Sequence, residues 1–408
     1  MKTITTLLMT LLLIATTATA QDVYVAGHEF QGTEAVVTLW ENGTAQTITD
    51  GTRMAIASSV YVTDGDVYIA GYEYNSVNYV AVLWKNGVPQ YLTDGSKPAG
   101  ATSVYIADGD VYVSGFEEEN TKNVAKLWKN GVEQALSDGT NDAVGNSVYV
   151  AGGDVYVAGW ESNGTRSVAK LWKNGVAQDL TDGTTGAAAY SVYVVGSDVY
   201  VAGDESNGSF YIAKVWKNGV AQSLTSGGSA ASAQSVFVFN GDVYVAGNEN
   251  NGSNSVAKLW KNGAVQTLTD GTNPGTATSV YVLGSDVYVA GSESNGTKSV
   301  AKLWKNGVEQ ALTDGTNVAV AASVFVTSSL GTGDISKNNF TLYPNPAQDV
   351  LNIQAIEPTT LQLYSLQGRL LQEIEADQNT QVDISGLASG IYLLKEMNGS
   401  TAYKVIKE

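Results

Sequence analysis

The stretch SVYVAGGDVYVAGWESNGTRSVAKLWKNGVAQDLTDGT, residues 147–184, decides the fold, because close copies of it recur every 44 residues. One tryptophan marks each copy, at Trp40, Trp84, Trp128, Trp172, Trp216, Trp260 and Trp304. Repetition at this period indicates an array of one supersecondary unit. Seven such units fill residues 21–328.

Each unit predicts four short β-strands. In the quoted copy they are Ser147–Val150, Asp154–Gly159, Ser167–Lys173 and Val176–Thr181, rich in β-branched and aromatic residues and bounded by turn residues. Asn174-Gly175 joins the last two strands and suits a type I′ hairpin turn. The expected fold is therefore all-β: a seven-bladed β-propeller of 44-residue repeats, with an open β-solenoid as the alternative.

The two ends of the repeat array favour a closed ring. The first unit enters at Asp22–Gly27, which matches the second strand of the quoted copy and has no first strand before it. The missing strand stands at the far end of the array, at Ser323–Val326. Pairing these two segments would remove the exposed edges of an open stack. We therefore expect them to lie side by side.

Residues 1–20 have the pattern of a secretory signal peptide. Lys2 precedes an apolar run, Leu7–Ile14, and the small residues Ala18-Thr19-Ala20 follow it. The run is too short to cross a bilayer as a helix, and no later stretch is apolar enough. We expect no transmembrane segment in the exported chain.

The overall composition limits the partners of the protein. The net charge of −18 disfavours nucleic acid and anionic membrane surfaces, because both would be repelled. The chain has no cysteine, which excludes a disulfide framework and thiolate metal sites. We expect no metal, no cofactor and a monomer.

One position varies while its surroundings stay constant. Residues 157–164 read VAGWESNG and residues 201–208 read VAGDESNG, so Trp160 corresponds to Asp204. Around the array this position carries four aromatic rings and then three small polar groups: His28, Tyr72, Phe116, Trp160, Asp204, Asn248 and Ser292. Tyr190, at the start of the first strand of its repeat, adds another aromatic ring.

These eight residues form the candidate ligand-binding site. They belong to the face with the longer loops, where function is usually carried on a rigid scaffold. Flat aromatic faces suit stacking on sugar rings or anchoring a protein partner, and the polar side supplies hydrogen bonds. The alternative is that the position tolerates drift and that its rings only pack.

Three other repeated features have structural explanations. The tryptophans should pack between blades. Lys170 should form a weak, exposed ion pair with Asp179 across a hairpin. A ring of glutamates could bind a cation, but we expect its members to accept hydrogen bonds from loop amides: Glu29, Glu73, Glu117, Glu161, Glu205, Glu249 and Glu293.

Enzyme chemistry has little support in the sequence. His28 is the only histidine, which excludes a histidine-clustered metal site and leaves a Ser-His-Asp triad dependent on one variable position. A sevenfold ring of glutamates does not single out the acid and the nucleophile of a glycosidase. We therefore predict a binding protein. The alternatives are an enzyme acting on extracellular polysaccharide and a scaffold without a pocket.

The C-terminal region differs from the repeats. Residues 329–339 predict a flexible linker. Residues 340–408 predict a small β-sandwich with strands at Val350–Ile353, Leu361–Tyr364, Leu370–Ile374, Gln381–Ile384, Ile391–Glu396 and Ala402–Ile406.

Four motifs of this region, FTLYPNPAQDVLNI (Phe340–Ile353), LYSLQGRLL (Leu363–Leu371), VDISGLASGIYLLK (Val382–Lys395) and KVIKE (Lys404–Glu408), resemble the C-terminal sorting domain of the Bacteroidetes type IX secretion system. Ser365–Gln367 departs from that family, which more often carries Asp or Asn before the glycine. The resemblance implies export through the periplasm by that machinery, and a protein that is secreted or attached to the outer-membrane surface.

The repeats, with their LWKNG signature, resemble uncharacterised secreted propellers, and this resemblance implies no activity. The sequence thus predicts a secreted or surface-displayed propeller that recognises a glycan or, as the second choice, a protein partner.

Overall fold

The computed structural model describes residues 21–328, 340–355, 358–365, 370–396 and 402–407. These residues form β-strands and no helix, so the all-β prediction is confirmed for them. Contacts divide the chain into Gln21–Ser328 and the remainder, and each unit is described by itself. The predicted signal peptide, 1–20, and linker, 329–339, lie outside the described residues. No helix in the described ranges could span a membrane.

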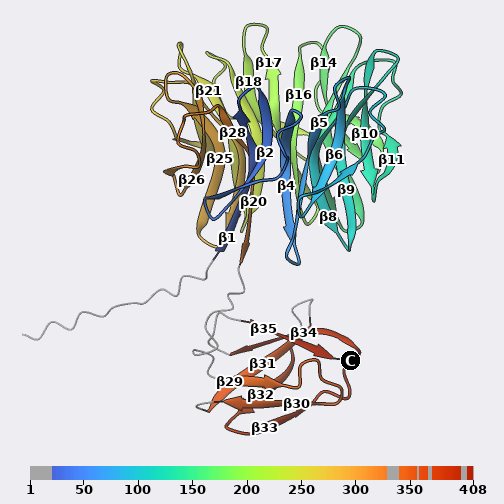
Figure 1. Ribbon diagram of the computed structural model, residues 1–408, viewed down its shortest axis with the longest axis vertical. Helices are drawn as coiled ribbons and strands as arrows, with labels where there is room; N and C mark the ends of the chain where they lie inside the picture. Colours follow the sequence, from blue (N-terminus) through green and yellow to red (C-terminus); the bar gives the residue numbers. More distant parts are fainter. Residues whose placement is uncertain (1–20, 329–339, 356–357, 366–369, 397–401, 408) are drawn as a thin grey trace, which may run out of the picture. The chain divides into compact units, whose positions relative to one another are not determined.

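The unit Gln21–Ser328 consists of seven four-stranded antiparallel sheets (Figure 1). The first sheet has the order β28 (Ala319–Ser328), β1 (Gln21–Gln31), β2 (Glu34–Glu41), β3 (Thr44–Thr47). The second has β4 (Ala55–Thr63), β5 (Asp66–Tyr74), β6 (Tyr79–Lys85), β7 (Val88–Tyr91). The third has β8 (Ala99–Ala107), β9 (Asp110–Glu119), β10 (Lys122–Lys129), β11 (Val132–Ala135).

The other four sheets follow the same order along the chain. The fourth has β12 (Ala143–Ala151), β13 (Asp154–Ser162), β14 (Ser167–Lys173), β15 (Val176–Asp179). The fifth has β16 (Ala187–Val195), β17 (Asp198–Ser206), β18 (Tyr211–Lys217), β19 (Val220–Ser223). The sixth has β20 (Ala231–Phe239), β21 (Asp242–Asn250), β22 (Ser255–Lys261), β23 (Ala264–Thr267). The seventh has β24 (Gly275–Leu283), β25 (Asp286–Ser294), β26 (Ser299–Lys305), β27 (Val308–Ala311).

The first and last repeats share one sheet, as the sequence predicts. Strand β28 pairs with β1, with Val326 opposite Val23 and Ser323 opposite Ala26. Strand β28 also contacts β24 of the seventh sheet and β4 of the second sheet. The strand that the first repeat lacks is therefore supplied by the end of the array.

Two continuous series of contacts join the first strands of neighbouring sheets. In each pair of neighbours a serine Oγ accepts a hydrogen bond of 3.1–3.3 Å from a valine N–H of the next sheet, and the last of these bonds joins Val60 N–H to Ser323 Oγ. The aromatic rings two positions after the serines contact one another with centroids 4.6–5.1 Å apart: Tyr61, Tyr105, Tyr149, Tyr193, Phe237, Tyr281 and Phe325. Both series return to their starting sheet.

The repeated tryptophans pack between sheets, which confirms their predicted role. All seven are 0–1% exposed. Trp216 of the fifth sheet, for example, belongs to a cluster with Ala158 and Leu171 of the fourth. The glycine before the variable position is part of this packing, because a Cβ at Gly159 would lie 2.9 Å from the ring of Trp172 and 2.0 Å from a backbone carbonyl oxygen. Close packing therefore requires glycine at this position, whereas the side chain that follows it can vary.

The C-terminal unit contains two antiparallel sheets. One has the order β29 (Phe340–Tyr343), β30 (Val350–Ala355), β33 (Thr380–Asp383), and the other has β32 (Leu370–Ala376), β31 (Thr359–Ser365), β34 (Gly390–Glu396), β35 (Ala402–Lys407). All six predicted strands are present to within a few residues, and β29 was not predicted. Side chains of both sheets, including Leu351 and Leu394, share one buried cluster.

Candidate ligand-binding site

The variable position lies on the second strand of each sheet, and the structure brings only part of the predicted site together. Trp160 on β13 and Asp204 on β17 line a pocket of about 290 Å³ between the fourth and fifth sheets, together with Tyr190 on β16. The other lining residues are Ser167, Ala187, Ala188 and Tyr211. Three of the eight predicted residues thus meet in one cavity.

The three remaining aromatic members of the predicted site do not line this cavity. The imidazole of His28 lies 6.2 Å from the ring of Phe30, and burial lowers its pKa. The ring of Tyr72 packs edge-on against Tyr79 at 5.2 Å. Phe116 is half-buried on β9. The contact between Tyr72 and Tyr79 fits the alternative that the rings at the variable position only pack.

The two remaining polar members also lie apart from the pocket. Ser292 is 9% exposed, and its hydroxyl lies 3.3 Å from that of Thr276. Asn248 occupies the corresponding place on β21. Neither residue lines the cavity of Trp160 and Asp204. Five of the eight predicted residues therefore lie outside the lining of this cavity.

A β-bulge places Tyr190 in the pocket. The pairing of β16 with β17 shifts between Ala189 and Ser191, so Tyr190 is an extra residue in the strand. Such a bulge redirects a side chain. The innermost strand of every sheet has this bulge, and the corresponding residues are small or carry an amide or hydroxyl: Ser58, Thr102, Asn146, Gln234, Thr278 and Ala322.

The other bulge residues show what Tyr190 replaces. Asn146 donates a hydrogen bond of 2.8 Å to the backbone carbonyl of Ala189, and Thr278 donates one of the same length to Ala321. Each of these two bonds ties the first strand of one sheet to the first strand of the next. Tyr190 instead contributes a phenol to the pocket wall. Burial, and then the neighbouring carboxylate of Asp204, raise the pKa of this phenol, so it is a neutral hydrogen-bonding group at physiological pH.

Asp204 is the chemically unusual residue of the pocket. Its side chain is 5% exposed, and its Oδ1 atom has no hydrogen-bond partner. Burial raises its pKa to about 6, while hydrogen bonds from Ser232 and Tyr190 act in the opposite direction. At neutral pH the pocket therefore holds a largely ionised carboxylate in low-dielectric surroundings.

Sequence reasoning missed four residues of the pocket, Ser167, Ala187, Ala188 and Tyr211. The signal for Tyr211 is present in the loop before it, because residues 207–211 read NGSFY where residues 163–167 read NGTRS and 295–299 read NGTKS. The fifth repeat thus departs from these two repeats at two neighbouring places, Asp204 and Tyr211, although the second repeat also has a tyrosine at the latter place, Tyr79. Two departures that converge in space mark a site better than variation at one position.

The glutamate ring differs from its prediction. Four of its members pair with basic side chains rather than with loop amides: Glu73 with Arg53 at 3.3 Å, Glu161 with Lys170 at 3.2 Å, Glu205 with Lys214, and Glu293 with Lys302 at 3.9 Å. The lysines reach these carboxylates because they stand on the adjacent third strand.

The ion pair of Lys170 and Asp179 is present at 2.5 Å, but it is not the exposed pair that was predicted. The side chain of Lys170 is only 14% exposed, because it lies between Asp179 and Glu161. A single ammonium group thus joins three neighbouring strands of the fourth sheet.

An acidic cluster on the third sheet has its own cation. Carboxylate oxygens of Glu117, Glu119 and Glu133 lie within 4.8 Å of one another. The Nζ atom of Lys126, whose side chain is 1% exposed, pairs with Glu119 at 2.5 Å and with Glu133. The ammonium group of Lys126 thus offsets part of the negative charge of this cluster.

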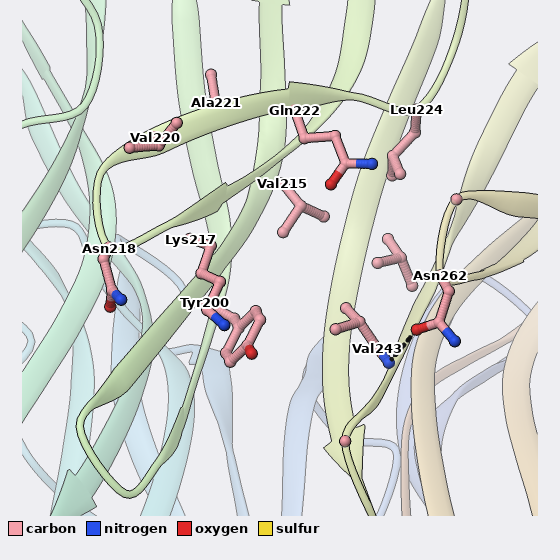
Figure 2. Close-up of a pocket in the computed structure, with 13 residues that line it drawn as sticks. Tyr200, Val215, Lys217, Asn218, Val220, Ala221, Gln222, Leu224, Val243 and Asn262 are labelled. Carbon is pink, nitrogen blue, oxygen red and sulfur yellow. Dashed lines mark hydrogen bonds between the residues drawn. The ribbon is translucent and has the colours of Figure 1, made fainter.

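A larger groove of about 610 Å³ lies between the fifth and sixth sheets. Figure 2 shows Val215 and Leu224 on one side of it and Val243 on the other. One difference between the repeats enlarges this groove: Val215 stands where the other six sheets have leucine, at Leu39, Leu83, Leu127, Leu171, Leu259 and Leu303. The missing methylene group leaves additional space at this point of the groove.

Filling the groove should stabilise the fold. Val215→Leu is expected to raise the free energy of unfolding by about 1 kcal/mol, because it restores one buried methylene group. The reverse change at the same place of the next sheet, Leu259→Val, should lower it by about the same amount. Denaturant unfolding of both variants checks this, and a destabilised Val215→Leu would show that the groove has another cause.

Comparison with known proteins agrees with the resemblance of the C-terminal region. Residues 341–408 match the family described as the secretion system C-terminal sorting domain. This domain implies interaction with the type IX secretion machinery and a secreted or cell-surface protein. The search of curated proteins finds no match.

Among solved structures, the β-propeller domain of the trilobed protease from Pyrococcus furiosus, described as having an open velcro topology, is similar. It is 11% identical with a TM-score of 0.49, and the alignment covers 72% of this chain and 93% of that chain. At this level of similarity we draw no argument from it.

Proposed function

We propose that residues 21–328 form a closed seven-bladed β-propeller that binds a ligand non-covalently in the pocket of Trp160, Tyr190, Asp204 and Tyr211. The closed ring is supported by the seven sheets, by the pairing of β28 with β1, and by the serine and aromatic contacts that return to their starting sheet. Residues 340–408 form a β-sandwich that directs export, supported by two sheets with a common core.

The observation that carries the binding proposal is the unpartnered Oδ1 atom of Asp204, a residue that lines the pocket. Buried polar groups in folded proteins are almost always hydrogen-bonded, so an unpartnered one on a residue beside a cavity with aromatic walls marks a place for a partner. A glycan is the first choice of ligand, because aromatic rings beside a carboxylate supply both the stacking surface and the hydrogen-bond acceptor that a sugar needs. A protein side chain is the second.

Catalysis by this pocket has less support. A raised carboxyl pKa is typical of general acids, and Asp204 has one. Glycosidases use two carboxyl groups, however, and Asp204 is the only acidic residue among those lining the pocket. We therefore propose binding without turnover.

A glycan-array screen of the full chain tests the proposal. Trp160→Ala should weaken the binding of any captured glycan by about tenfold or more, because stacking on a large ring is lost. Tyr72→Ala removes a predicted aromatic residue that lies outside the pocket, and it should leave binding nearly unchanged. Binding that survives Trp160→Ala would contradict the proposed site, and product formation from any polysaccharide would favour an enzyme.

A further inference from the structure

The pocket between the fourth and fifth sheets contains a negative charge that the described residues do not balance. Asp204 is buried, and its Oδ1 atom is unpartnered. The hydroxyl groups of Ser232 and Tyr190 act on the carboxylate, but both are neutral. A buried ionised carboxylate is costly unless a counter-charge meets it.

The four lysines on the strands of these two sheets, Lys170, Lys173, Lys214 and Lys217, already pair with carboxylates. Lys170 of the fourth sheet pairs with Glu161 and Asp179. Lys214 of the fifth sheet pairs with Glu205. No basic residue contributes to the electrostatic surroundings of Asp204 in the described part of the chain. Arg166, in the loop before Ser167, is not among the groups that shift the pKa of Asp204, so a bound ligand is the remaining source of positive charge at this carboxylate.

The walls of the pocket are suited to such a charge. Three of the lining residues are Trp160, Tyr190 and Tyr211. The faces of aromatic rings attract cations, and those of tryptophan do so most strongly. The volume of about 290 Å³ lies at the lower end of the range for small-molecule sites. The cavity therefore fits one compact group and not a large ligand as a whole.

We propose that this pocket takes an organic ammonium group, carried on an amino sugar or on an alkylammonium compound, with Asp204 as its counter-ion. The inference rests on the proposed function and adds the charge of the ligand. A neutral sugar hydroxyl would give the carboxylate a hydrogen bond but leave the charge unbalanced. An ammonium group supplies both the hydrogen bond and the charge, or the charge alone when it is quaternary.

Calorimetric titration of the full chain at neutral pH tests this with two matched pairs of compounds. Choline is compared with its uncharged tert-butyl analogue, and glucosamine with glucose. The charged member of at least one pair should bind about tenfold more tightly than the neutral member. A preference only in the choline pair would identify an alkylammonium ligand, and one only in the glucosamine pair an amino sugar.

Two variants separate the role of Asp204 from a general effect of charge. Asp204→Asn should abolish the preference for the charged compound, and the residue fits because Asn248 occupies the same place in the next sheet. Asp198→Asn removes a negative charge from the same strand, where Asp198 pairs with Lys217 at 2.7 Å. This control should keep the preference.

Three outcomes would overturn the inference: equal affinity for charged and neutral compounds, a preference that persists in Asp204→Asn, or failure of both ammonium probes to bind. If a neutral glycan still binds in a manner that depends on Trp160, the proposed function stands and only the ammonium group is wrong. If neither the probes nor any array glycan binds, both proposals fail.

Discussion

A chain that runs from Gln21 to Val318, and so lacks β28, is expected to lose its cooperative unfolding transition or to melt at least about 10 °C below the chain that ends at Ser328. The shorter chain lacks Val324 and Val326, which are 4% and 1% exposed. It also leaves the inner edge of β1 unpaired. Each buried valine contributes roughly 1.5–3 kcal/mol, and a typical domain has only about 5–15 kcal/mol in total.

The chain that ends at Ser328 is the matched control, because it lacks the same C-terminal unit but keeps β28. Circular dichroism melts and limited proteolysis compare the two chains. The control should melt cooperatively. If the chain ending at Val318 melts within a few degrees of the control, β28 does not hold the repeat array together, and the closed ring is wrong.

Asp204→Asn is expected to stabilise the protein at neutral pH by up to about 3 kcal/mol. The pKa of Asp204 is raised from 3.8 to about 6 by burial. A raised carboxyl pKa favours folding only while the group is protonated. That contribution is complete below the unfolded value of 3.8 and is lost as the pH rises through about 6. A difference of about two pKa units corresponds to about 3 kcal/mol.

The difference between the variant and the wild type should therefore be small near pH 4 and reach its full size above about pH 7. The groups that face Asp204 are Tyr190 from β16, Ser232 from β20 and the aromatic residues Trp160 and Tyr211. None of them changes charge in this window. Unfolding in denaturant at a series of pH values measures the difference, and acids elsewhere cancel between the two proteins.

Asp182→Asn gives a control of the opposite sign. Asp182 is an exposed turn residue, and hydrogen bonds from Thr184 lower its pKa. Its contribution is present above the unfolded pKa and is lost as the pH falls, so the variant should lose stability at neutral pH. A pH-independent effect of Asp204→Asn would mean that the carboxylate finds a partner in solution and is not a strained charge.

Local signals in the sequence were enough to predict the repeat architecture. Asn174-Gly175 predicts a hairpin turn, and both residues have the positive φ angles that this turn requires. The segment Ser323–Val326 was predicted to pair with Asp22–Gly27 because one repeat unit begins without its first strand, and the pairing is present. Turn residues and a missing strand can be recognised by comparing the repeats with one another, without knowing which side chains meet in space.

The candidate site was only partly predictable, because the sequence gives the position of a residue in the repeat but not its neighbours across the gap between sheets. Trp160 and Asp204 were singled out by their variation, yet nothing in that variation shows that they meet each other and not His28 or Ser292. The bulge at Tyr190 and the lysine partners of Glu161 and Glu205 depend on strand pairing and on the reach of side chains.

The shared first sheet also sets the order of events when the protein is made. Residues 21–31 are synthesised before the rest of the repeat array, yet the partner strand of this segment is synthesised almost three hundred residues later, at 319–328. Intermediate sheets can form as they emerge, but the nascent protein keeps one open edge until its last repeat arrives. Folding of the repeat array is therefore complete only after residues 319–328, the last strand before the C-terminal domain in the sequence, have been synthesised.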